Sequence, residues 1–224
     1  VRWNNSERGI ISPAEFIPIA EQIGKIHEIG NIVIDKSCQF MQQLKKADID
    51  IRFIEINLSP VQCLHPNLSQ QILSVVKKYG LEPKDICFEI TETTVNRTPA
   101  IIKTNLENLA SSGFLIAIDD FGTGYSNMTQ LISLPFRIVK LDRSLVEAAS
   151  RSENGKLGMQ GLVTMFKHIK MELIAEGVET AQQVEQTISM GIDYIQGYYF
   201  SKPLNPDMFK EYITKDETHN HVYN

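Results

Sequence analysis

The sequence predicts an α/β domain whose strands form a parallel sheet covered by helices on both faces. Six short apolar runs alternate with longer amphipathic segments along 224 residues. The runs are continuously apolar rather than alternating, which is typical of strands buried on both faces. Neither a linker nor a repeat of fixed period divides the chain. Two closures satisfy this pattern, an open doubly wound sheet and a (β/α)8-type barrel, and six strands alone do not decide between them.

The predicted strands are short runs rich in β-branched and aromatic residues. The segment 1–3 has the pattern of a strand end, and no initiator Met precedes it, so we interpret the chain as a fragment whose upstream part supplies further strands. The six clear strands cover 53–57, 86–90, 114–118, 138–141, 173–175 and 194–195.

Helices are predicted between these strands from apolar spacing and terminal signals. Ser12 and Glu15 form a capping box with Pro13 at the first helical position. Thr180 and Gln183 predict a second capping box, for a helix that ends before Gly191. Further helices are predicted at 32–46, 68–79, 99–110 and 156–169.

Composition limits the classes of function. A net charge of -5 gives no electrostatic footprint for polymeric DNA or RNA, so we expect no such partner. The three cysteines, Cys38, Cys63 and Cys87, are odd in number and widely spaced, which favours a reducing, cytoplasmic location over a disulfide framework. No apolar run reaches the roughly 18–20 residues of a membrane-spanning helix. We expect one domain over 1–213, followed by a polar, frayed tail over 214–224.

The informative polar residues follow the strands. In a parallel barrel these positions lie on the face where active sites form. One acidic residue at such a position is usually a helix cap or a solvated loop residue, but six strands that end in the same way are hard to explain by capping. The residues concerned are Asn57, Glu89 and Glu92, Asp119 and Asp120, Lys140 and Asp142, Glu176 and Glu179, and Gln196.

Carboxylates that converge at one end of a sheet repel each other unless cations lie among them. Carboxylate and amide oxygens are the ligands that Mg²⁺ and Mn²⁺ prefer. Two such cations suit displacement at phosphorus, and the adjacent Asp119 and Asp120 can serve one cation each. No histidine follows a predicted strand, which argues against a zinc hydrolase.

A glycine-containing loop follows the aspartate pair. Residues 119–126 read DDFGTGYS, and the two glycines allow a loop that changes shape and approaches a ligand closely. The segment lacks the Gly-Lys-Ser/Thr ending of a phosphate-binding P-loop. An ordinary structural turn remains the alternative interpretation of this segment.

Taken in order, seven motifs resemble those of the EAL-domain cyclic-di-GMP phosphodiesterases. The resemblance extends from Val1 to about Met208. It implies a TIM-like (β/α)8 barrel of EAL type, with one antiparallel strand near its start and the first strand or strands missing from this chain. The motifs are SPAEFIP at 12–18, INLS at 56–59, EITE at 89–92, DDFGTGYS at 119–126, KLD at 140–142, AEGVE at 175–179, and QGY at 196–198 with KPL at 202–204.

The resemblance also implies an activity, cleavage of cyclic-di-GMP to linear pGpG with Mg²⁺ or Mn²⁺, two per site. Lys140 and Glu176 are then the catalytic residues: Lys140 holds the attacking water and offsets charge on the phosphate, and Glu176 also binds metal. Gln196 contacts a guanine and Arg2 a phosphate. The remaining roles are metal binding by Asn57, Glu89, Asp119 and Asp120, and support of the site by Glu92 for the 119–126 loop, by Glu179 for the Lys140 region, and by Asp142.

One departure leaves an alternative open. The Glu-Ala-Leu motif that gives the family its name would end immediately before Val1, and its Glu is a metal ligand. A parent protein without that Glu would be a catalytically inactive cyclic-di-GMP receptor or scaffold. An unrelated metal-dependent barrel enzyme would require all seven motifs to match by coincidence. The resemblance further implies a homodimer, an upstream sensor or GGDEF domain, and a parent protein that can be membrane-anchored.

Overall fold

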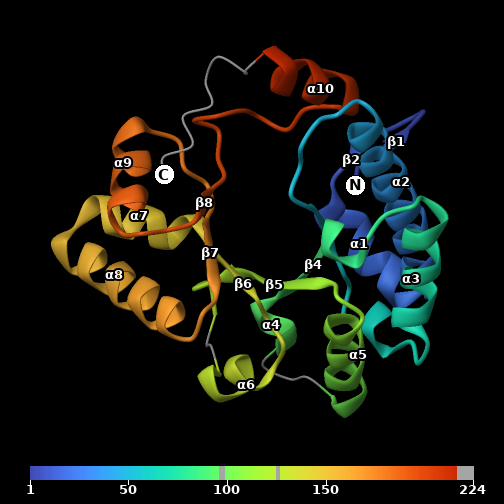
Figure 1. Cartoon of the computed structure of the whole chain (residues 1–224), viewed down its shortest axis with the longest axis horizontal. Coiled ribbons are helices and arrows are strands. Elements are labelled where there is room, and N and C mark those ends of the chain that lie inside the picture. The colour runs from blue at the N-terminus through green and yellow to red at the C-terminus, as the bar shows by residue number, and fades with distance from the viewer. Residues whose placement is uncertain (96–98, 125–126, 216–224) are drawn as a thin grey trace.

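The computed structural model describes residues 1–95, 99–124 and 127–215. These residues form a curled parallel sheet with helices around its outer face (Figure 1). The strands lie in the sheet in the order of the sequence. A doubly wound sheet reverses its strand order at a switch point, so this order decides for the barrel type of topology. The strands are β3 Ile54–Asn57, β4 Ile86–Thr91, β5 Leu115–Phe121, β6 Ile138–Leu141, β7 Glu172–Ala175 and β8 Tyr194–Ile195.

The sheet is a partial barrel. Every neighbouring pair from β3 to β8 is parallel. Within the described residues β3 and β8 do not pair with each other, so the TIM-like wall is open between them. All six strand predictions are confirmed, and the largest difference is β5, which continues through a bulge to Phe121 rather than ending at residue 118.

An antiparallel hairpin precedes the sheet. It consists of β1 Trp3–Asn5 and β2 Gly9–Ile11. The prediction that 1–3 is the end of a strand is wrong, because a strand begins at Trp3. Helix α1 Pro13–Gln22 follows, with the Ser12 side chain accepting a hydrogen bond from the Ala14 N–H. The Glu15 carboxylate pairs with Arg8 at 3.2 Å rather than completing the predicted capping box.

Most helices lie where the sequence places them. The Thr180–Gln183 capping box is confirmed. The helices that match predictions are α2 Ile26–Lys46, α3 Leu68–Lys78, α5 Ala100–Ser111, α8 Glu153–His168 and α9 Ala181–Ser189. Those not predicted are α4 Glu92–Val95, α6 Met128–Ser133, α7 Arg143–Arg151 and α10 Pro206–Lys215, with 3-10 turns η1 Gln62–Leu64 and η2 Pro83–Asp85.

The start of α2 corrects the prediction, because this helix begins at Ile26 and not at residue 32. Gly30 lies inside it, where glycine costs about 1 kcal/mol relative to alanine. A Cβ at Gly30 would lie 1.9 Å from Nε2 of the buried Gln62. This glycine therefore permits close packing of α2 against η1 and does not end a helix.

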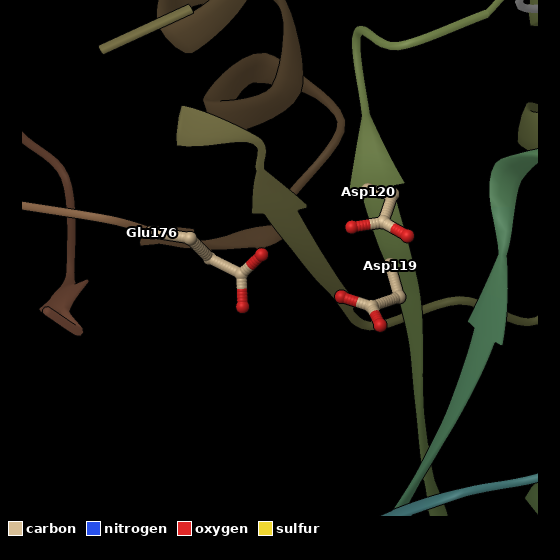
Figure 2. A group of neighbouring side chains, drawn as sticks. All are labelled: Asp119, Asp120 and Glu176. Carbon is tan, nitrogen blue, oxygen red and sulfur yellow. The ribbon is translucent and has the colours of Figure 1, made fainter. Parts of the chain in front are cut away.

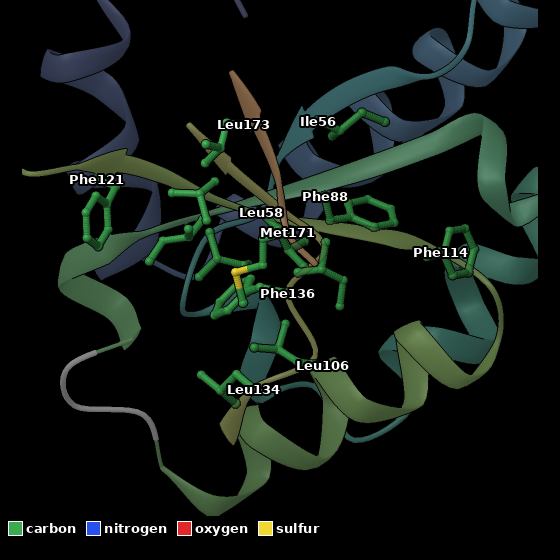
Figure 3. Packing of buried hydrophobic residues seen from close by; sticks show 14 of the residues in the cluster. Ile56, Leu58, Phe88, Leu106, Phe114, Phe121, Leu134, Phe136, Met171 and Leu173 are labelled. Atoms are coloured by element: carbon green, nitrogen blue, oxygen red, sulfur yellow. The ribbon is translucent and has the colours of Figure 1, made fainter. Parts of the chain in front are cut away.

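The hydrophobic core has two parts. The larger part fills the space between the outer face of the sheet and the helices, with side chains such as Phe88, Leu106 and Phe136 (Figure 3). The smaller part lies on the other face of the strands, inside the curled sheet, and consists of Cys87, Ala117, Ile138 and Ile174 with Phe53 and Leu115 packed against it. Strands buried on both faces explain the continuously apolar runs of the sequence.

No helix in the described parts of the chain is long and apolar enough to cross a membrane. The three cysteines are buried and free. Helix α10 extends two residues beyond the predicted domain end at residue 213. Residues 216–224 of the predicted tail lie outside the described residues.

Candidate active site

The smaller part of the core, Cys87, Ala117, Ile138 and Ile174, forms an apolar plug inside the curled sheet. A layer of charged side chains lies directly above this plug. Side chains two residues apart on a strand lie on the same face. Cys87 in the plug is thus followed by Glu89, Ala117 by Asp119, Ile138 by Lys140, and Ile174 by Glu176, just past the end of β7. The plug excludes water from below, and the carboxyl ends of the strands supply the charges above it.

Lys140 lies at the centre of the charged layer, with a side chain only 5% exposed. Its ammonium forms an ion pair and hydrogen bond with Glu89. It lies 2.7 Å from Glu176 Oε1 and 3.3 Å from Asp119 Oδ1. Glu55 Oε2 lies 3.9 Å away. One buried cation therefore faces four carboxylates.

This imbalance changes the proton affinity of the cluster. Burial raises the pKa of Glu89 to about 7, although the attraction of Lys140 opposes the change. Burial also raises the pKa of Glu55 and Glu176, again against Lys140. For Lys140 itself burial acts to lower the pKa, but the carboxylates outweigh burial and hold the pKa above its ordinary value. The cluster thus has a deficit of positive charge that a divalent cation would relieve.

The side chains of Asp119 and Asp120 both point towards this carboxylate cluster, although neighbouring residues on a regular strand point to opposite faces of the sheet. The register of β5 against β6 shifts between Ile118 and Phe121, and Asp120 has φ of 55°. This left-handed conformation at a bulge turns the second carboxylate towards the first (Figure 2). Burial and the neighbouring Asp119 raise the pKa of Asp120.

Asp119, Asp120 and Glu176 form a candidate metal-binding group. Each offers a carboxylate oxygen, and these oxygens lie within 4.8 Å of one another (Figure 2). Asn57 lies on neighbouring β3 and donates from Nδ2 to Glu89 Oε2 at 2.7 Å. That bond uses the amide nitrogen, so it does not consume the amide oxygen, which is the atom that binds cations.

The loop after β5 rests on Glu92. The Gly122 N–H donates to Glu92 Oε2 at 2.9 Å, and the Glu92 side chain is buried. Gly122 has φ of 107°, and a Cβ there would lie 2.6 Å from Leu145 Cδ1. Only glycine fits this turn without movement of its neighbours. Tyr125 and Ser126, which belong to the predicted loop motif, lie outside the described residues.

The remaining predicted site residues lie around the charged layer. Glu179 pairs with Arg143 at 2.7 Å, and both line a pocket of about 540 Å³ together with Gln196. The Asp142 side chain caps α7 by accepting from the Ser144 N–H. Gln196 follows β8 directly, and its N–H donates to the carbonyl oxygen of Ala175, the residue before Glu176, at 2.8 Å.

Arg2 is separate from this group. It lines an apolar groove of about 780 Å³ beside α1 and α2, with Trp3 and Phe16. Its Nη1 donates to the carbonyl oxygen of Val1 at 2.8 Å. The structure therefore brings together the predicted metal ligands and Lys140, but it does not bring Arg2 into contact with them.

Comparison with known proteins identifies the family. The family model of the EAL domain matches residues 1–203. The chain belongs to the EAL domain family. A bifunctional diguanylate cyclase/cyclic di-GMP phosphodiesterase, MucR of Pseudomonas aeruginosa, is 32% identical over 91% of this chain and 30% of its own length. The oxygen sensor protein DosP of Escherichia coli is 31% identical over 91% of this chain and 25% of its own.

A solved structure supports the same assignment. This EAL domain superposes with a TM-score of 0.85 on the PaMucR phosphodiesterase in complex with c-di-GMP, at 31% identity over 93% of this chain and 84% of that one. The chain spans less than a third of the length of the two curated relatives.

Glu55 is the residue of this EAL domain that the sequence analysis missed. It lies on β3 two residues before Asn57, within the strand rather than at its end. Its Oε1 is buried and has no hydrogen-bond partner among the described residues. The signal that could have found it is the period of two, which places residues 55 and 57 on one face.

Proposed function

We propose that this EAL domain hydrolyses cyclic di-GMP to linear pGpG with the help of Mg²⁺ or Mn²⁺. The observation that carries the proposal is the buried Lys140 among four carboxylates, directly beside the Asp119, Asp120 and Glu176 group. Hydrolysis adds water across one phosphodiester: a water oxygen bonds to phosphorus, one ester P–O bond breaks, and the leaving oxygen takes up a proton.

The residues present fit divalent cations. The ligand set is oxygen only, from Asn57, Glu89, Asp119, Asp120 and Glu176, which suits Mg²⁺ or Mn²⁺. The excess of buried carboxylates over cations supports two ions rather than one. Such ions supply charge neutralisation of the phosphate and lower the pKa of a water molecule.

Lys140 and Glu176 are the catalytic side chains in this proposal. The Lys140 ammonium donates hydrogen bonds to the attacking water and offsets the negative charge that grows on the phosphate oxygens. Glu176 lies 2.7 Å from Lys140 Nζ and orients the same water. Both groups are held at the ends of buried strands, so they are positioned before the substrate binds.

The surrounding residues bind and align the substrate. Gln196 offers amide groups to a guanine edge from the pocket that it shares with Arg143 and Glu179. Arg2 lies in the separate groove beside α1 and α2, and we assign it a phosphate contact from the family resemblance alone. Glu92 keeps the loop after β5 in place through Gly122, Asp142 fixes the start of α7, and Glu179 fixes the region after Lys140 through Arg143.

The test is hydrolysis of cyclic di-GMP, followed by chromatography, on a chain that begins upstream of Val1, with Mg²⁺, Mn²⁺ and EDTA compared. We expect pGpG with either cation and none with EDTA. Tight nucleotide binding without product in all three conditions would contradict the proposed activity and indicate an EAL-type receptor or scaffold. Product that forms equally in EDTA would contradict the assignment of the metal ligands.

We also propose that the domain acts as a homodimer within a longer signalling protein. The oxygen-sensor and diguanylate cyclase names of its relatives, each much longer than this chain, support a sensor or GGDEF partner domain. Sedimentation at a series of dilutions tests the dimer, and a constant monomer mass at all concentrations would contradict it.

A further inference from the structure

Glu55 is a carboxylate of the charged layer without a role in the mechanism proposed above. Its Oε2 lies 3.9 Å from Lys140 Nζ, which is an ion-pair distance but too long for a hydrogen bond. Its Oε1 is buried and has no hydrogen-bond partner among the described residues. A buried polar atom without a partner costs about 1–3 kcal/mol, so its retention in the structure calls for an explanation.

Lys140 has three N–H donors. In the structure its nearest acceptors are Glu89, Glu176 and Asp119. These three carboxylates are the ones that the proposed function assigns to divalent cations. A carboxylate that binds a divalent cation is a weaker hydrogen-bond acceptor for an ammonium group. Glu89, Asp119 and Glu176 therefore cannot bind divalent cations and also hold the Lys140 ammonium at full strength.

We propose that Glu55 is a positioning residue that holds the Lys140 ammonium in place while Glu89, Asp119 and Glu176 bind cations. This inference rests on the proposed function. Glu55 lies within β3, one step deeper than Asn57, and reaches Lys140 from the side of the apolar plug. A movement of about 1 Å converts its 3.9 Å contact into a charge-assisted hydrogen bond.

Glu55 differs in place from the ligands. Asn57 is the last residue of β3 and Glu176 lies just past the end of β7, whereas Glu55 lies two residues before the end of β3 and pairs in register with Cys87 of the plug layer. Glu89, which pairs with Asn57 and Ala117, lies one level above Glu55. A group in this position can support Lys140 from below without occupying the space above it. It acts through Lys140 and does not touch the substrate.

The kinetic test compares Glu55→Gln with wild type in the hydrolysis assay. Loss of an outer partner of a catalytic group typically costs about 10- to 100-fold in activity. We expect kcat to fall by that factor, with KM and the Mn²⁺ concentration for half-maximal rate unchanged. Glu55→Asp, which keeps the charge on a shorter side chain, should recover part of kcat. Glu172→Gln removes a strand carboxylate at the opposite end of the sheet and is the matched control, with kcat unchanged.

Two kinetic outcomes would overturn the inference. A wild-type value of kcat in Glu55→Gln would show that the position of the Lys140 ammonium does not depend on Glu55. An increase of tenfold or more in the half-maximal Mn²⁺ concentration, with normal kcat at saturation, would make Glu55 a metal ligand instead.

A second measurement needs neither substrate nor metal. Melting temperatures in EDTA are measured for wild type, Glu55→Gln, Lys140→Met and the double variant. Without Lys140 the Glu55 charge has lost its cation, so we expect Glu55→Gln to raise the melting temperature more in the Lys140→Met background than in wild type. Equal changes would mean that the two side chains do not interact, which overturns the inference. If wild type has no hydrolytic activity, the proposed function fails, and this cycle alone then decides whether Glu55 supports Lys140.

Discussion

The two ends of the curled sheet differ in how their charges are matched. At the end where the strands begin, Arg52 and Lys45 each have one carboxylate partner. Arg52 holds Glu172 with two hydrogen bonds of 2.5 and 2.8 Å, and Lys45 pairs with Asp85 at 2.5 Å. At the end where the strands finish, Lys140 alone faces four carboxylates.

This difference indicates which end of the sheet contributes to stability and which end carries the functional site. Matched pairs leave no demand for a further ion. Unmatched buried carboxylates cost folding free energy unless a ligand completes them. In parallel barrels active sites lie at the carboxyl ends of the strands, which is the end where this sheet has its unmatched charges. The charge deficit therefore marks the site independently of any sequence motif.

The largest expected effect is on turnover, and it distinguishes the unmatched Lys140 from the matched Arg52. Lys140→Ala should lower turnover of cyclic di-GMP by about 10²–10³-fold, because a group that stabilises developing charge is lost. Glu176→Ala should do the same. Nucleotide binding by calorimetry should remain measurable in both variants.

Arg52→Ala is the control for these variants, since Arg52 is a matched cation at the other end of the sheet. Its turnover should stay within about twofold of wild type. Near-normal turnover in Lys140→Ala would remove the catalytic role, and an equal loss in Arg52→Ala would show that both variants act through stability.

The second effect is on pH dependence in EDTA. The folded state raises the pKa of Glu89 from 4.5 to about 7, so it holds this proton more tightly than the unfolded chain does. Stability should therefore fall as pH rises from about 4.5 to 7, by on the order of 3 kcal/mol. Denaturation at several pH values measures this slope. Glu89→Gln should reduce this slope and leave the contributions of Glu55, Glu176 and Asp120, whose pKa values are also raised. Glu172→Gln should not reduce it, and an unchanged slope in Glu89→Gln would assign it to those other groups.

The third effect is stabilisation by cations. Mn²⁺ at about 100 times its Kd should add roughly 2.7 kcal/mol, or about 5–10 °C in Tm for a domain of this size. Asp119→Asn and Asp120→Asn should lose most of this shift, whereas Arg52→Ala should keep it. An undiminished shift in both aspartate variants would place the cation elsewhere.

The sequence predicted the strands well and the helices less well, for physical reasons. A strand buried on both faces is a continuous apolar run, and each of the six was found. Helix α7 was missed because Asp142 was interpreted as a site residue, although its side chain caps that helix. The start of α2 was predicted at residue 32 rather than Ile26, because Lys25 at its N-cap makes no side-chain capping hydrogen bond and so leaves no terminal signal in the sequence.

The site was predictable where it depends on strand ends and not where it depends on geometry within strands. Asn57, Glu89, Asp119, Lys140 and Glu176 follow from their positions in the strand pattern. The turning of Asp120 by a left-handed residue in a bulge does not, because a regular strand would point it away from Asp119. The position of Asp120 directly after a strand indicated it as a ligand, and the bulge explains how it faces the site.

The smallest expected effect tests whether the matched end of the sheet serves stability alone. Arg52 is about half exposed and lies over the rings of Phe53 and Tyr194 at 5.3 and 5.2 Å, besides its pair with Glu172. Exposed ion pairs contribute up to about 1 kcal/mol, and cation–π contacts add a similar amount. Arg52→Ala should therefore lower Tm by a few degrees, and 1 M NaCl should reduce the difference because salt screens the ion pair. A loss that salt does not change would assign the contribution of Arg52 to its packing on the two rings rather than to its charge pair.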